Sequence, residues 1–169
     1  MSDKKPQLTG SDVEKIEAEI GDRKLVKRPV LIAAVQEARA QGDLSENFEY
    51  YAAKKAKNEN ESRIRYLERM LRMATIIPDS SKDDEVGLNN KVVLYFEEDD
   101  EEQEYKVVTS IRGNSLENRI SNESPIGRAI IGHKVGDRVS IKVNDSYSYY
   151  VQIRAIDKTP ADDDEIKKF

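Results

Sequence analysis

The chain has 169 residues, which is enough for one ordinary domain or two small ones. It contains no cysteine, so disulfide bonds and thiolate metal sites are excluded. No long apolar run is present, so we expect neither a transmembrane helix nor a secretory signal, and the short polar N-terminus fits a cytoplasmic protein.

The charge is unevenly distributed along the chain. Residues 1–80 carry 15 basic and 14 acidic side chains, whereas the remaining 89 residues carry 13 basic and 19 acidic ones. The net charge of -5 is not that of a free nucleic-acid binder, which is usually basic. We therefore expect any nucleic-acid contact in the first half of the chain.

Residues 11–75 have the apolar spacing of a helical hairpin. Apolar side chains recur at intervals of three and four residues in both arms, as in a coiled-coil seam. They are Val13, Ile16, Ile20, Val30, Leu31, Ala34, Val35 and Ala38 in the first arm, and Ile64, Leu67, Leu71 and Ala74 in the second. Pro29 predicts a bend or a new helix start, because its backbone has no N–H to donate. The short break at 41–47 favours antiparallel arms.

The middle of the second arm departs from this pattern. Lys57 and Asn60 are polar, although they stand one heptad before Ile64 and Leu67. This polar stretch suggests a surface that touches something other than the first arm.

The break between the arms has the sequence QGDLSEN at residues 41–47. Gly42 is suited to end a helix in the left-handed conformation, and Asp43 or Ser45 is suited to begin the next one. Asp43 and Glu46 also have the spacing of a capping box, and each carboxylate stabilises a helix N-terminus by about 0.3–1 kcal/mol. From the residues alone, capping is the preferred role of this pair.

The second half of the chain changes to strand-like patterns. Segments rich in Val, Ile and Tyr predict strands at 91–96, 104–108, 138–143 and 147–156, with an acidic loop at 97–102. Ser124 followed by Pro125 predicts a short capped helix.

These patterns together predict an α+β protein with two folded parts. The expected segments are a coiled-coil hairpin over 8–77, a charged linker over 78–85, a small α+β domain over 86–158 and an acidic, disordered tail over 159–169.

Residues 38–50, with the sequence ARAQGDLSENFEY, resemble the hairpin-tip signature of the GreA/GreB family of bacterial transcription factors. Three other stretches agree, namely RPVL at 28–31, RIRYLE at 63–68 and SPIGRAIIG at 124–132. The resemblance covers residues 8–157 and is strongest to GreA. It implies a coiled-coil hairpin followed by an FKBP-like domain.

The resemblance implies a transcription elongation factor that enters the secondary channel of bacterial RNA polymerase. Such a factor stimulates the polymerase's intrinsic cleavage of backtracked nascent RNA, so it is not itself an enzyme. The implied catalytic residues are Asp43 and Glu46, which assist the second Mg²⁺ and the attacking water. Two carboxylates leave most ligand positions to water, so we expect the ion to be shared with the polymerase active site rather than held tightly by the free protein.

The resemblance also implies contacts with partners. Arg39 and Lys54 match basic residues that contact the displaced RNA 3′ segment. Ser124, Pro125 and Ile126 match the surface that docks on the secondary-channel rim of the largest polymerase subunit. Purely structural roles are the alternatives to these contacts. The basic residues would then belong to a solvated helix face, and the docking residues would be a helix cap with a core isoleucine. A monomer without membrane contacts is expected.

Several residues depart from the family pattern or have ambiguous roles. Phe48 stands where the family more often has a small residue, Gly127 replaces a common Ala, and His133 replaces a common Lys. Tyr50 and Tyr51 are suited to stack on a base, but we expect them to pack the hairpin. We expect His133 to be a cation near a helix C-terminus rather than part of a Ser/His/Asp triad.

Two other functions compete with transcript cleavage. A Gre-like regulator could occupy the same channel and inhibit without cleavage, although the presence of Asp43 and Glu46 argues against it. An FKBP-like domain also suggests a prolyl isomerase or a chaperone. An isomerase needs an aromatic-lined apolar pocket, and the second half has no Trp and places its aromatics mostly in strands, so we expect no such activity.

Overall fold

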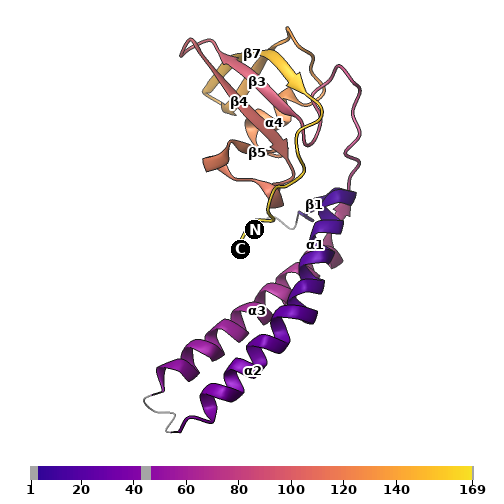
Figure 1. Cartoon of the computed structure of the whole chain (residues 1–169). Helices are drawn as coiled ribbons and strands as arrows, with labels where there is room; N and C mark the ends of the chain where they lie inside the picture. The colour runs from indigo at the N-terminus through magenta and orange to yellow at the C-terminus, as the bar shows by residue number, and fades with distance from the viewer. Residues whose placement is uncertain (1–3, 43–46, 169) are drawn as a thin grey trace. The chain divides into compact units, whose positions relative to one another are not determined.

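The computed structural model describes residues 4–42 and 47–168 (Figure 1). The chain divides into two units, one made mainly of residues 11–75 and the other of residues 76–168 together with 7–10. The α+β fold class is confirmed, because the first unit is a helical hairpin and the second is a β-sheet with one short α-helix.

The first unit consists of four helical segments. They are α1 (Gly10–Asp22), the π-helical turn η1 (Arg23–Lys27), α2 (Arg28–Arg39) and α3 (Phe48–Met73). The new helix start predicted at Pro29 is confirmed, since Pro29 lies in the first turn of α2. The Arg28 N–H bonds back to the Arg23 carbonyl, five residues earlier, so a π turn absorbs the discontinuity that proline imposes.

The hairpin seam follows the predicted spacing, with one exception. Ile16 and Leu67 are completely buried and Ile64 nearly so, and α2 runs beside α3 (Figure 1). Val30 was expected in the seam but is 66% exposed, and it lies in the first turn of α2, just after the π turn. A π turn changes the angular step of the helix, which explains why spacing alone misplaced this side chain.

The polar middle of α3 is an internal contact and not an outer surface. Asn60 is buried, donates to the Arg23 carbonyl at 3.2 Å and accepts from the Arg23 guanidinium at 3.0 Å. Glu19 accepts from both Arg63 and Arg23 at 2.8 Å. Burial raises the pKa of Glu19, but the hydrogen bonds from Arg63 and Arg23 outweigh that effect and lower it. The suggestion that this stretch touches something other than the first arm was therefore wrong for Asn60.

The second unit is built on a five-stranded sheet with the order β5-β4-β3-β7-β6. Its strands are β3 (Lys91–Phe96), β4 (Glu101–Val108), β5 (Arg119–Ser121), β6 (Arg138–Asn144) and β7 (Tyr147–Asp157). Only the β4–β5 pair is parallel. The helix α4 (Pro125–Ile130) contributes Ile130 to the core, which also contains Val92, Leu94, Val107, Ile141 and Ile153.

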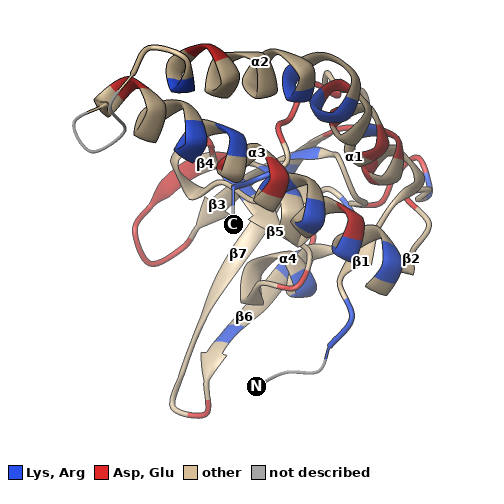
Figure 2. Cartoon of the chain, turned by 90° about the horizontal axis from the view of Figure 1, so that it is seen from below, with Lys and Arg blue, Asp and Glu red and all other residues tan. Residues whose placement is uncertain are grey.

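Several shorter elements complete the described chain. They are the strands β1 (Gln7–Leu8) and β2 (Thr75–Ile76) and the 3-10 helices η3 (Ser110–Arg112) and η4 (Ser115–Glu117). The predicted acidic loop is shorter than expected, because Glu101 and Glu102 already pair with Phe96 and Tyr95 in β4 and β3. The turn that remains between these strands, residues 97–100, consists entirely of acidic residues (Figure 2).

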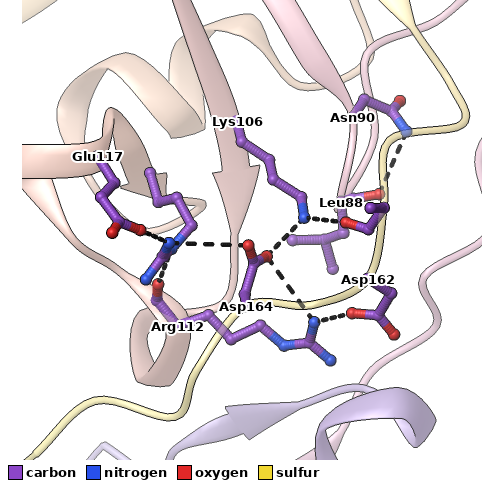
Figure 3. A network of polar contacts seen from close by, with 9 residues as sticks. Leu88, Asn90, Lys106, Arg112, Glu117, Asp162 and Asp164 are labelled. Atoms are coloured by element: carbon purple, nitrogen blue, oxygen red, sulfur yellow. Dashed lines mark hydrogen bonds and ion pairs between the residues drawn. The ribbon is translucent and has the colours of Figure 1, made fainter.

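The acidic tail packs against the second unit, contrary to the predicted disorder. Asp164 is buried and contacts the ammonium of Lys106 at 2.6 Å, with Arg119 at 3.8 Å and Arg112 at 3.9 Å (Figure 3). Arg112 has no exposed surface and also pairs with Asp162. Buried cations need counter-charges, and these aspartates supply them, so an acidic composition here serves packing and not solvation.

Candidate functional site

The two arms of the hairpin are joined at the tip by Asn47. Its side-chain oxygen accepts from the Tyr50 N–H at 3.0 Å, which makes it the N-cap of α3. Its amide nitrogen donates to the carbonyl of Ala38 at 2.7 Å, near the end of α2. One side chain therefore caps the second arm and ties it to the first. The expectation that Asp43 or Ser45 would begin the helix was wrong, since α3 begins at Phe48 behind Asn47.

The carboxylates predicted to be catalytic, Asp43 and Glu46, lie outside the described residues. The chain is described on both sides of them, up to Gly42 and from Asn47 onward. Gly42 has a φ of 117°, in the region that favours glycine, as the sequence predicted.

Arg39 is fixed at the end of α2 by an aromatic partner. Its guanidinium carbon lies 5.6 Å from the centre of the Tyr50 ring, and its Nη2 lies 3.4 Å from the Tyr50 hydroxyl. The pKa of Tyr50 is lowered, first by this hydrogen bond and further by the positive charges of Arg39, Lys54 and Lys57. The expected packing role of Tyr50 is confirmed, and it orients the nearby guanidinium.

Lys54 lies on the solvent-exposed side of α3, two turns from its start. It lines a shallow depression together with Tyr51, Lys55, Asn58, Glu59 and Ser62. Lys55 is paired only loosely with Glu59, at 3.9 Å between exposed side chains. Tyr51 is 52% exposed, so the packing expected for both tyrosines was wrong for this one. These side chains present cationic groups and an aromatic ring to solvent close to the tip.

The predicted docking residues begin α4 in the second unit. The Ser124 hydroxyl accepts from the Gly127 N–H at 3.1 Å and donates to the Ser121 carbonyl at 2.6 Å, so Ser124 is the N-cap. Pro125 is exposed at the first position of the helix, whereas Ile126 is half-buried against the core. The capping alternative is confirmed for Ser124, and the exposed Pro125 leaves a surface available for docking.

Gly127 has a steric reason to be glycine in this chain. A Cβ at this position would lie 2.0 Å from the Ser121 carbonyl oxygen, which is far too close. The carbonyl is held there by the Ser124 hydroxyl. The departure from the alanine that is common in the family therefore follows from how closely β5 approaches α4.

His133 forms part of a turn and shows no catalytic arrangement. Its Nδ1 lies 3.1 Å from an Asp137 oxygen, which also accepts from the Lys134 N–H at 3.0 Å. No serine hydroxyl within the described part of the chain is hydrogen-bonded to His133. The same described residues contain no cluster of three or more metal-ligating side chains, and no helix long and apolar enough to cross a membrane.

Both units match family models of the same bacterial transcription factors. The N-terminal model of the transcription elongation factors GreA and GreB matches residues 6–76, and the C-terminal model matches residues 80–158. Transcription elongation factor GreA of Streptococcus thermophilus is 38% identical over 160 residues, which is 94% of this chain and 99% of that protein. GreA of Thermoanaerobacter pseudethanolicus is 44% identical over 137 residues, which is 80% of this chain and 87% of that protein.

Among solved structures, the GreA factor homolog 1 (Gfh1) protein of Thermus thermophilus is 28% identical and covers 90% of this chain and 99% of that one, with a TM-score of 0.42. A helical hairpin followed by a small α+β unit, each matched by its own family model, defines a bacterial-type transcription elongation factor. The chain belongs to the GreA/GreB family. The resemblance drawn from the tip sequence is thereby confirmed.

The sequence reasoning missed Asn47 as a functional residue. The sequence does not single it out, because Asp43 and Ser45 are equally good caps and come earlier in the turn. The available signal was its spacing, because Asn47 stands three residues before Tyr50, the distance at which an N-cap side chain reaches a backbone N–H.

Proposed function

We propose that this protein enters the secondary channel of bacterial RNA polymerase and stimulates the polymerase's own cleavage of backtracked RNA, rescuing arrested complexes. The observation that carries this proposal is the hairpin tip, where Asn47, the residue that follows Glu46 in the sequence, caps α3 and bonds to Ala38 near the end of α2. Membership of the GreA/GreB family, with relatives named transcription elongation factor GreA, supports it.

The chemistry follows from what a polymerase active site needs. Phosphodiester cleavage uses two metal ions about 3.5–4 Å apart, and Mg²⁺ prefers hard oxygen ligands. Asp43 and Glu46 would hold the second Mg²⁺ and orient the attacking water, while the polymerase holds the first ion. In this proposal the polymerase supplies the active site, and the protein acts as a cofactor of that enzyme.

Two further groups of residues complete the proposed contacts. Arg39, oriented by Tyr50, and the exposed Lys54 would attract phosphates of the displaced RNA 3′ segment. Ser124, Pro125 and Ile126 would dock on the rim of the channel in the largest subunit. We propose that the protein does this as a monomer in the cytoplasm.

The test is RNA cleavage in polymerase complexes that have been backtracked on a defined template. Asp43→Ala and Glu46→Ala should each abolish the stimulated shortening of the RNA while leaving polymerase binding intact. Asp163→Asn, an exposed acidic change in the tail, is the matched control and should cleave like the wild type. Undiminished cleavage by both tip variants would contradict the proposal, and inhibition without shortened RNA would favour a channel-blocking regulator.

A further inference from the structure

Phe48 is the most exposed aromatic side chain in the described part of the hairpin. It occupies the first position of α3 and is 84% exposed. Burying a phenylalanine fully is worth about 1.5–3 kcal/mol, and folding of the free protein recovers little of this. Phenylalanine is also a mediocre helix former and does not cap, so this residue is not explained by the stability of the hairpin.

Tyr51 lies on the same side of α3, because residues three apart on a helix are neighbours. It is 52% exposed, and its ring meets the Tyr50 ring edge-on at 5.6 Å. Tyr50 itself is buried and in contact with Arg39, so the Tyr51 ring packs on its edge against a ring that is held in place. Two aromatic rings therefore face solvent within the first turn of the second arm.

Cations follow these rings within one helical turn. Lys54 and Lys55 come three and four residues after Tyr51, and all three side chains line the same shallow depression. Glu59 offsets part of the charge of Lys55. Lys54 makes no ion pair with another described residue, so its charge remains available to a phosphate.

We propose that Phe48, Tyr51, Lys54 and Lys55 form a binding face for single-stranded RNA, on which the two rings stack against bases of the backtracked 3′ segment and the two lysines contact its phosphates. This inference rests on the proposed function, and it adds base stacking by the two aromatic residues to that function. Aromatic rings with cations nearby are the composition by which proteins hold single strands without strict sequence preference.

The composition favours RNA over a protein partner. A protein docking patch needs a continuous apolar area of some size, whereas the apolar surface here is limited to two rings and gives way to lysines within one turn. Stacking also depends on the base, since purines have larger π faces than pyrimidines. The face should therefore favour backtracked RNA that carries purines in its displaced segment.

The first test measures the protein concentration that gives half-maximal cleavage of backtracked complexes. Phe48→Leu, which keeps apolar bulk but removes the ring, should raise this concentration about tenfold, and Phe48→Tyr should restore it, in line with the loss of one base stack. The shift should be larger for purine than for pyrimidine segments. Leu25→Ala, at an apolar side chain 81% exposed elsewhere on the hairpin, is the control and should change nothing.

The second test is photocrosslinking from 4-thiouridine placed in the displaced RNA segment, with the full-length protein bound to the polymerase. Crosslinks to the peptide containing residues 48–55 support the binding face whether or not cleavage occurs. Their absence overturns it, as does a Phe48→Leu variant that cleaves like the wild type. If Phe48→Leu weakens binding to polymerase without RNA to the same extent, the face contacts protein and the proposal is overturned. A wild-type protein that crosslinks but stimulates no cleavage refutes only the proposed function.

Discussion

Removal of one carboxylate from the tail should destabilise the second unit strongly. Asp164 is 8% exposed and lies between three cations that are themselves largely buried, Lys106, Arg112 and Arg119 (Figure 3). Deleting one partner of a buried ion pair typically costs 3–5 kcal/mol, because the remaining charge is left without compensation. The loss of stability caused by Asp164→Asn should lie at the lower end of this range, about 3 kcal/mol, because Asp162 still pairs with Arg112.

Hydrogen–deuterium exchange of β4 is the appropriate assay, because it reports on the second unit alone. A loss of about 3 kcal/mol corresponds to roughly 100-fold faster exchange of the buried amides of Val107 and Val108. Asp163→Asn, one residue away and exposed, should change the free energy of unfolding by less than about 0.5 kcal/mol. The difference should persist in high salt, since buried pairs are poorly screened. Equal exchange rates in the two variants would refute the reasoning.

Three further predictions concern a cap, a close approach and a titration. Asn47→Ala should lower the stability of the hairpin by about 1 kcal/mol, measured by circular dichroism during urea unfolding, with Asn47→Asp as a control that keeps the cap. Gly127→Ala should cost about 1–3 kcal/mol in thermal unfolding of the second unit, and a neutral result would show that the backbone around α4 yields easily. The hydrogen bonds from Arg138, and then from Gln152, lower the pKa of Glu97 to about 2, from an ordinary value of 4.5. A depressed carboxyl pKa stabilises the fold above 4.5 and loses this effect as the pH falls toward 2, so Glu97→Gln should flatten the dependence of the melting temperature on pH in that window; unchanged curves would contradict it.

The sequence was sufficient where one period dominates a segment. Ile16, Ile64 and Leu67 were assigned to the seam from their spacing alone and are buried in the structure. Strand β3 was placed with its observed bounds because it is a short run of β-formers between polar turns. Strand β5 was missed, since three residues that include Arg119 carry no readable alternation, and its pairing with β4 is parallel and nonlocal.

Interactions between charged residues far apart in sequence could not be predicted. Periodicity identifies which side chains are apolar, but it does not say which polar residues meet, so the contact between Asn60 and Arg23 could not be read from the seam pattern. The prediction that the tail is disordered was wrong for a related reason. Composition alone cannot distinguish a solvated aspartate from one that neutralises a buried cation such as Arg112. At the tip, the residue types and their order gave the candidate carboxylates, while the actual cap depended on which of several suitable residues the backbone reached.

The polar contacts of the hairpin bear directly on its proposed activity. Apolar seams tolerate slippage by one heptad, because many leucine-like side chains fit many neighbouring positions, whereas a single buried polar contact permits only one register. Asn60 donates to the carbonyl of Arg23 in the π turn, and Arg63 shares Glu19 with Arg23, so these contacts are satisfied in one alignment of the arms alone. Asn47 makes a second polar contact between the arms at the tip, where its side chain donates to the Ala38 carbonyl. Contacts at both places keep the two arms in one register, and the proposed assistance to a metal ion held by another protein would require such a fixed hairpin.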